Sequence, residues 1–348
     1  MEAKVDILMV GHGITGANFN LAARKRGLST FVIDQPKNNR SSSVAVGLFH
    51  PMAFRDSKYA WAGKDTYEEA LDFYRSIDPD AKLVQELLLY RVLSSTEEYN
   101  RWRQRMTEPA FEDEFDFARK LDHIEAPHGL GKVRSCAKLD VSAFLQHSIS
   151  TQADHYSQHD FDYAALNGNC YQSAGLKIEF NRLVFCEGLG VKNNPWFNWL
   201  PFKPAKGDVL RVRLSEPLKA AVNKKHFFAP GMDNTQWLGA TYNWNCDEAE
   251  PEMDAAEELM EVGRSFYKEK IVPLEHLAGI RPASFDRRPF VGKADEEEYY
   301  VLNGMGSKAC LLAPKCSHIL LDYMSGNGKV PPEMAMERVR KYLSKKAN

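Results

Sequence analysis

Residues 4–16 read KVDILMVGHGITG and decide the fold class. The continuous apolar run of residues 4–10 predicts a strand buried on both faces, as in a parallel sheet. Residues 17–26 then have the pattern of a helix ended by Gly27, and a second apolar run, residues 30–33, finishes at Asp34. Strand, glycine turn, helix and strand together predict a crossover unit of about 30 residues in an α/β domain.

The glycine turn of this unit has the G-x-G-x-x-G spacing of a dinucleotide-binding site. Gly11 permits the tight turn, Gly13 allows a pyrophosphate to approach the backbone, and Gly16 lets the helix pack close to the strand. The first-turn N–H groups of the helix then face the phosphates. Asp34 stands where a carboxylate accepts hydrogen bonds from ribose hydroxyls, which disfavours the 2′-phosphate of NADP. The motif is shared by NAD and FAD sites, and its candidate contacts are Gly11, Gly13, Ile14, Thr15, Gly16 and Asp34.

Composition excludes several other classes of protein. The 348 residues include 45 Lys and Arg against 47 Asp and Glu, which gives a net charge of −2. These totals do not indicate the basic surface that binding to nucleic acid requires. The six cysteines form no C-x-x-C pair and no histidine cluster has zinc-ligand spacing, so we expect neither a disulfide scaffold nor a metal site. The apolar run after the N-terminus is too short for a signal peptide or a membrane span, and we expect a cytoplasmic protein.

The rest of the chain alternates helical and strand patterns. Helical periodicity is predicted over residues 64–106, with Leu83–Leu89 included, and over residues 139–150 and 253–270. Residues 107–127 are acidic and rich in Phe and Pro, which predicts an excursion out of the sheet. Residues 206–244 alternate apolar and polar side chains, as in an antiparallel sheet. Further buried strands are predicted at residues 183–186 and 299–303, and the latter leads through Gly304 into a last helix ending near Met324.

Four separated segments carry a family resemblance. They are the glycine turn of residues 11–16, SSSVAVGLFHP at 41–51, GIRPASFDRRPFVG at 279–292 and VLNGMGSKACLLAP at 301–314. Taken in order, they resemble the D-amino-acid oxidase family of FAD-dependent amine oxidoreductases, which includes glycine oxidase, sarcosine oxidase and the FAD domain of the bacterial tRNA methylaminomethyl-uridine enzyme. The third segment is close to the family pattern G-x-R-P-x-[ST]-x-D-x-x-P-x-[IV]-G. Two departures are Ala309-Cys310, where the family commonly has a glycine, and His12, which replaces a small residue.

The resemblance implies an α/β fold class, and an α+β arrangement for the chain as a whole. A discontinuous Rossmann-like FAD-binding domain would carry an inserted substrate domain built on a mixed or antiparallel sheet. We expect the FAD-binding domain to comprise residues 1–80, 141–203 and 279–348, and the substrate domain to comprise residues 81–140 and 204–278.

The resemblance also implies roles for single residues. Arg281 would hold a substrate carboxylate through its guanidinium fork, or else pair with an acid such as Asp286. Lys308 would place positive charge near reduced flavin, or lie solvated on its helix. His50 would contact substrate or flavin, or pack within its loop, and Tyr242 would contact substrate or belong to the core of its sheet. The implied cofactor contacts beyond the first glycine turn are Ser42, Ser43, Gly47, Gly188, Gly304, Gly306, Ser307, Lys308 and Ala309.

The predicted function is the oxidation of a C–N bond in a small amine or amino acid. Hydride transfer to flavin N5 would give an imine that water hydrolyses, and the electrons would pass to O2 or to another acceptor. The leading alternative is an oxidase for the carboxymethylaminomethyl group of a tRNA wobble uridine, which the near-neutral charge disfavours. An NAD-dependent dehydrogenase is disfavoured by residues 279–292 and 301–314. A non-catalytic flavin-binding protein remains a third possibility because of Ala309-Cys310.

Overall fold

The computed structural model divides the chain into two compact units and describes residues 1–35, 40–78, 80, 82–231, 234–245 and 248–347. Cys246, one of the six cysteines counted in the sequence, lies outside the described residues. Unit 1 comprises residues 1–42, 141–205 and 281–348, and unit 2 comprises residues 43–140 and 206–280.

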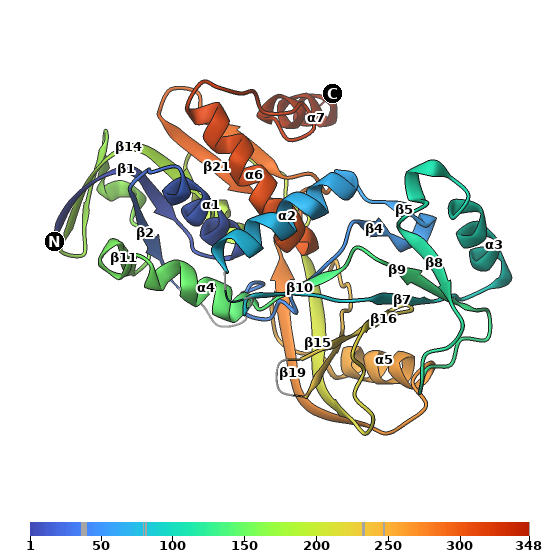
Figure 1. The fold of residues 1–348 in the computed structure, drawn as a ribbon. Coiled ribbons are helices and arrows are strands. Elements are labelled where there is room, and N and C mark those ends of the chain that lie inside the picture. Colours follow the sequence, from blue (N-terminus) through green and yellow to red (C-terminus); the bar gives the residue numbers. More distant parts are fainter. Residues whose placement is uncertain (36–39, 79, 81, 232–233, 246–247, 348) are drawn as a thin grey trace. The chain divides into compact units, whose positions relative to one another are not determined.

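Unit 1 is built on a sheet whose central strands are parallel, as the apolar run at the N-terminus predicts (Figure 1). β1 (Glu2–Val10) lies between β2 (Thr30–Asp34) and β14 (Leu176–Phe185), and both pairings are parallel. Residues 7–10 of β1 are almost fully buried because helices or strands cover both faces. The other strands of the sheet are β11 (Tyr156–Gln158), β12 (Leu166–Asn167), β13 (Cys170–Ser173), β20 (Phe290–Lys293) and β21 (Tyr299–Asn303).

Within the residues that the structure describes, four α-helices belong to unit 1. α1 (Ile14–Lys25) follows the glycine turn and packs against both α4 (Val141–Ser150) and α6 (Ala309–Met324). α7 (Met336–Ala347) closes the chain and packs on β20, so that Met336 and Val339 join the core of the sheet. The helix after the first glycine turn and the helix after the second are therefore neighbours.

Unit 2 is built on a second, mostly antiparallel sheet of eight strands in the order β19-β15-β18-β17-β16-β7-β9-β8. α5 (Met253–Arg264) lies on this sheet and contributes Leu259 and Met260 to its core. The other elements of unit 2 include α2 (Gly63–Ile77), α3 (Thr96–Arg105), a sheet of β3 (Leu48–Phe49), β10 (Ala137–Leu139) and β6 (Val84–Glu86), and the pair β4 (Met52–Ala53) and β5 (Lys58–Tyr59). The large sheet comprises β19 (Ile271–Arg281), β15 (Ala205–Leu214), β18 (Gln236–Gly239), β17 (Phe227–Pro230), β16 (Ala221–Asn223), β7 (Leu89–Val92), β9 (Leu130–Val133) and β8 (Phe115–Ala118).

The mixed α/β class is confirmed, and three local predictions are wrong. Residues 83–89 lie in and between strands β6 and β7, not in a helix, because pairing with β10 and β9 overrides a weak helical pattern. Residues 107–127 are not wholly outside the sheet, since β8 pairs with β9 at its edge. The helix predicted over 253–270 ends at Arg264, and β19 begins at Ile271.

Residues 43–80 lie in unit 2, although we expected them in the cofactor-binding domain. The reason is local pairing: β3 pairs with β10, and α2 packs against β6. Assigning unit 1 to the cofactor and unit 2 to the substrate stays a proposal.

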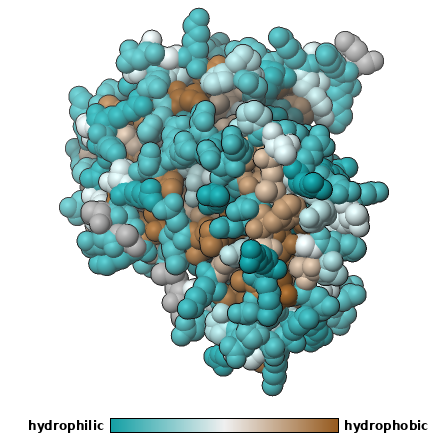
Figure 2. Space-filling view, turned by 45° about the vertical axis from the view of Figure 1, so that its right-hand side comes forward, coloured by the Kyte–Doolittle hydropathy of each residue, from teal (hydrophilic) through white to brown (hydrophobic). Residues whose placement is uncertain are grey.

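The described surface combines apolar and polar areas, and Figure 2 shows hydrophobic side chains surrounded by hydrophilic ones on one face of the molecule. Its most exposed large apolar side chains include Met253, Leu274, Tyr242 and Trp244. Within the described residues, no helix has both the length and the apolar composition that crossing a bilayer requires.

Candidate functional site

The first glycine turn of unit 1 is held by contacts that leave no room for a side chain. Gly11 has φ +94°, and a Cβ there would lie 2.6 Å from the carbonyl oxygen of Cys186 at the end of β14. A Cβ on Gly16 would lie 2.1 Å from the carbonyl oxygen of Gly11. These approaches seat the N-terminus of α1 at the carboxyl ends of β1 and β14, where open α/β sheets bind their ligands.

The N-terminus of α1 presents backbone donors. Its N-cap, Gly13, makes no side-chain capping bond. The hydroxyl of Ser42 takes this place, because its Oγ accepts a hydrogen bond of 3.1 Å from the Ile14 N–H. A Cβ on Gly13 would lie 2.9 Å from the same Oγ. The helix dipole and the bare backbone around Gly13 and Thr15 therefore suit an anionic group such as a pyrophosphate.

The Asp34 carboxylate lies at this turn and is already engaged. Its Oδ1 accepts a hydrogen bond of 2.8 Å from the His12 N–H, and Arg40 forms an ion pair of 2.9 Å with Oδ2. Asp34 is only 6% exposed. A ribose hydroxyl would therefore share this carboxylate with Arg40. Arg40 was missed in the sequence, although its position six residues beyond Asp34 is a usable signal.

The His12 side chain points into the protein. Its Nε2 lies 3.0 Å from Ser148 Oγ on α4, and its ring packs edge-on against Tyr156. Burial lowers the pKa of His12 to about 4, so the imidazole is neutral at physiological pH. Only the backbone N–H of His12, bonded to Asp34, contributes directly to the turn.

The second glycine turn of unit 1 converges on the first. Thr15 Oγ1 donates to Met305 Sδ over 3.5 Å, which links the start of α1 to the turn of residues 304–306. Asn303 Nδ2 donates to the Gly188 carbonyl oxygen over 2.9 Å, and Asn303 Oδ1 accepts from the Gly304 N–H. Asn303 was also missed, and an Asn directly before a glycine turn is its signal.

Gly304 and Gly306 have positive φ angles of +80° and +56°. A Cβ on Gly304 would lie 2.7 Å from the Phe290 ring, so that turn requires glycine. Gly188, also at positive φ, faces Pro282. The glycine positions near residues 11–16, 188 and 304–306 thus lie in one region of unit 1.

Lys308 lies beside this region as the N-cap of α6, between Ser307, which is exposed, and Ala309, the first residue of the helix. Within the described part of the chain, its ammonium has no hydrogen-bond or ion-pair partner, and burial lowers its pKa to about 8. A desolvated cation at a helix N-terminus without a side-chain cap creates a strongly positive site. Such a site suits negative charge on a bound ligand.

Arg281 ends β19 and begins the last segment of unit 1. Its carbonyl oxygen accepts a hydrogen bond of 2.8 Å from the Ala283 N–H, and Ala283 forms a β-bridge with Met305. Arg281 therefore lies two residues before Ala283, the residue that pairs with the second glycine turn. Asp286, the acid considered as its structural partner, forms an ion pair of 2.9 Å with Arg338.

Four candidate residues lie in unit 2, and each is described within that unit. The Gly47 carbonyl oxygen accepts a hydrogen bond of 3.0 Å from the Leu139 N–H, while Ser43 is exposed. His50 Nδ1 accepts a hydrogen bond of 3.2 Å from the Met52 N–H, which places the proton of the neutral ring on Nε2. Tyr242 is 56% exposed and stacks on Trp244, so it is not a core residue.

The residues of unit 1 fit a dinucleotide cofactor. The N-termini of α1 and α6, neither of which has a capping side chain on its own N-cap residue, and the Lys308 ammonium provide positive potential for its phosphates and for an anionic ring. The Asp34 carboxylate is the acceptor available to a ribose.

We expect Lys308→Met to stabilise the cofactor-free protein at pH 7 by about 3 kcal/mol, the free energy that corresponds to the lowered pKa of Lys308. Below pH 8 the ammonium is charged in both the folded and the unfolded state, so folding desolvates a charge. Between pH 8 and 10.5 the folded state binds fewer protons than the unfolded state, so wild-type stability rises and the advantage of the variant shrinks. Urea unfolding at pH 7 and pH 10 measures this, with Lys341→Met as the exposed control. A destabilised Lys308→Met protein at pH 7 would contradict the expectation.

Comparison with known proteins identifies the family. The family model for FAD dependent oxidoreductases matches residues 6–323. A curated relative, the tRNA 5-methylaminomethyl-2-thiouridine biosynthesis bifunctional protein MnmC of Idiomarina loihiensis, is 21% identical over 96% of this chain and 58% of its own length. A second, from Campylobacter concisus, is 29% identical over 37% of this chain and 21% of its own length. The chain thus spans a little over half of the first relative.

Solved structures share the fold. Glycine oxidase from Geobacillus kaustophilus has a TM-score of 0.76 at 16% identity, covering 94% of this chain and 96% of its own. Iminodiacetate oxidase from Chelativorans sp. BNC1 has a TM-score of 0.76 at 17% identity, covering 96% and 98%. Because the family model spans most of the chain, the predicted resemblance and cofactor are confirmed. The chain belongs to the family of FAD-dependent oxidoreductases, and FAD is its cofactor.

Proposed function

We propose that the protein oxidises the C–N bond of a small amine that carries a carboxylate. The observation that carries the proposal is the position of Arg281, whose chain continues through Pro282 and Ala283 into contact with the second glycine turn of the cofactor region. A guanidinium there suits a carboxylate through two parallel hydrogen bonds. The reaction removes two electrons and the α-hydrogen from the amine, and water hydrolyses the resulting imine.

Bound FAD supplies the two-electron acceptor for this chemistry. The chain's own residues would bind the cofactor, orient the substrate and stabilise negative charge on the cofactor. Arg281 would fix the carboxylate and thereby the α-carbon, and Lys308 with the N-terminus of α6 would stabilise negative charge on the electron-accepting ring. The contacts with FAD would come from the glycine turns, from Ser42, and from Asp34.

Unit 2 would be the substrate domain that the family resemblance implies. Val46, Val209 and Ala229 form a small apolar cluster against which Leu48 and Trp237 pack partly exposed, and such a surface excludes water from a reacting amine. Tyr242 would contact substrate through its exposed ring, and His50 would act through Nε2. O2 or another acceptor would reoxidise the cofactor. We also propose a cytoplasmic location, as the sequence predicts.

We expect amines that carry a carboxylate to bleach the flavin of the purified holoprotein under anaerobic conditions. The panel comprises glycine, N-methylglycine, iminodiacetate, both enantiomers of alanine and proline, and methylamine as the compound lacking a carboxylate. Absorbance near the long-wavelength flavin band reports reduction, and admission of air separates an oxidase from a dehydrogenase. A flavin reduced by dithionite but by no member of the panel would overturn the proposal.

Arg281→Lys is expected to raise KM for the carboxylate-bearing substrate by about 10- to 100-fold, because lysine retains the charge and loses the fork. Reduction by an amine without a carboxylate should change little. Stopped-flow measurement of the limiting rate and the half-saturating concentration separates binding from chemistry. Arg213→Lys, an exposed position on β15, is the matched control. An equal loss with both kinds of amine would show that Arg281 does not bind carboxylate.

A second candidate is an oxidase for a carboxymethylaminomethyl uridine in tRNA. This candidate is favoured by the similarity of the chain to curated relatives whose names refer to tRNA 5-methylaminomethyl-2-thiouridine biosynthesis. Under this alternative, unmodified tRNA should bind with an affinity that falls steeply between 50 and 200 mM salt, since each phosphate contact releases counterions. Filter binding with tRNA and with a duplex DNA of equal length measures it. Absence of binding at 50 mM salt would leave the small-amine proposal alone.

A further inference from the structure

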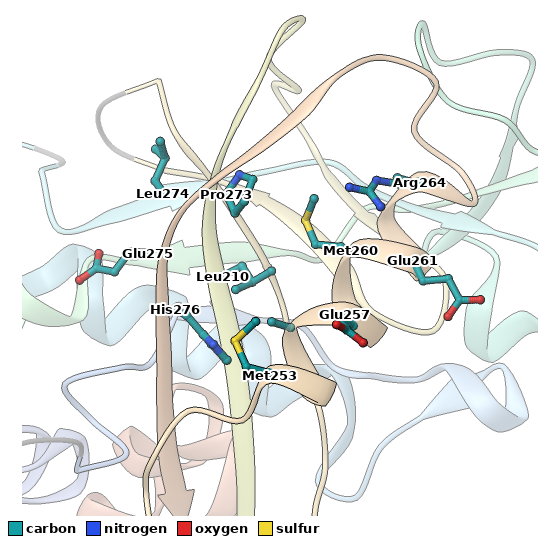
Figure 3. Close-up of a pocket in the computed structure, with 11 residues that line it drawn as sticks. Leu210, Met253, Glu257, Met260, Glu261, Arg264, Pro273, Leu274, Glu275 and His276 are labelled. Atoms are coloured by element: carbon teal, nitrogen blue, oxygen red, sulfur yellow. The ribbon is translucent and has the colours of Figure 1, made fainter.

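A groove of about 610 Å³ lies on unit 2 between α5 and the strands β15 and β19 (Figure 3). Its floor is apolar and includes Leu210, Met260 and Pro273. Met253 and Leu274 stand at its margin and are 71% and 39% exposed. The groove is made entirely of unit 2 residues and contains none of the residues proposed for cofactor or substrate.

The groove exists because the helical layer on this sheet is incomplete. α5 packs on β18, whereas β19 is the edge strand. Helices pack about 8–10 Å apart on a common face, so a second helix beside α5 would lie over β15 and β19 and cover Met253 and Leu274. Such a helix would remove the exposed side chains of Met253 and Leu274 from water.

The charge around the groove indicates the sign of its occupant. Residues 248–261 contain seven acidic residues and no Lys or Arg, and Arg264, which also lines the groove, offsets one of these charges. Among the described residues, Glu252 pairs with Lys206 and Glu258 with Lys225. Glu257 and Glu261 line the groove and form no ion pair within the described chain. They stand four residues apart on α5 and repel each other, so a cation placed between them is favoured.

A second copy of this chain fits the groove poorly. Its acidic margin would face an identical acidic margin across a two-fold contact. The basic helix of the chain, α7, has its apolar face buried in its own unit through Met336 and Val339. A folded copy would therefore offer lysines to the groove without the apolar side chains that its floor requires.

We propose that this groove receives a basic amphipathic helix of a partner protein. The helix would place apolar side chains at i, i+3 and i+7 on Leu210, Met260 and Leu274, and Lys or Arg beside Glu257 and Glu261. This binding surface lies outside the residues assigned to oxidation, and its occupant is defined by its apolar stripe and its positive charge.

The test uses the holoprotein and a fluorescein-labelled peptide of residues 334–347, whose Met336, Val339 and Leu343 lie on one helical face beside basic side chains. Fluorescence anisotropy should show saturable binding that weakens with salt. A peptide with every Lys and Arg changed to Glu should not bind, and one with Val339 and Leu343 changed to Ser should bind at least tenfold more weakly.

The double variant E257K/E261K should weaken binding of the basic peptide by about tenfold or more. The control E179K/E296K makes the same change in net charge at exposed carboxylates of unit 1 and should bind as wild type does. Flavin content should match in all three proteins. Equal binding by E257K/E261K, or no saturable binding by wild type, would overturn the proposal. So would a wild-type dimer by light scattering that Leu274→Asp converts to monomer, since a second copy would then cover the groove.

Discussion

The close approach of backbone to backbone at Gly11 is the constraint on which the cofactor region depends. The Gly11 turn packs against the carbonyl of Cys186, and Gly16 packs against the carbonyl of Gly11, at distances that no side chain tolerates. These contacts fix α1 at the ends of β1 and β14 and direct its first-turn N–H groups outward. The second turn then follows from α1, because α1 packs against α6 and Thr15 bonds to Met305. One steric condition therefore positions two helix N-termini.

The parts of the site that were predictable from the sequence are those with a steric or periodic signature. Gly11 and Gly304 need glycine for measurable reasons, and the buried strand before Gly11 has an unbroken apolar run. Arg40 and Asn303 have no steric or periodic signature. Only their positions, after Asp34 and before Gly304, indicate them, and the Asn303 contact with Gly188 forms where distant parts of the chain meet. The pairing of residues 84–92 is equally non-local. Its strands find partners near residues 130–139, and only the folded chain reveals that preference over a helix.

Lys308 shows how burial and charge combine in this region. A lysine at the N-cap of α6 opposes the positive end of its own helix and has lost much of its hydration, so the ligand-free fold carries an unfavourable charge there. Proteins retain such unfavourable charges where a ligand offsets them. His12 differs from Lys308, because burial leaves its imidazole neutral and its Nε2 lies within hydrogen-bond distance of Ser148 Oγ, as in a packing residue.

The near-zero net charge is a sum that hides strong local differences. Residues 248–261 contribute seven negative charges, whereas α7 contributes five positive charges and one negative charge in twelve residues. The total of −2 therefore carries little weight against a nucleic-acid partner and little in favour of a small substrate. What the charges do locally is more informative: α7 uses Arg338 to hold Asp286 and Arg340 to hold Asp295, so much of its charge stabilises unit 1. Glu257 and Glu261 form no ion pair within the described chain. Two such carboxylates beside an apolar floor are a stronger indication of a partner than the net charge of the chain is.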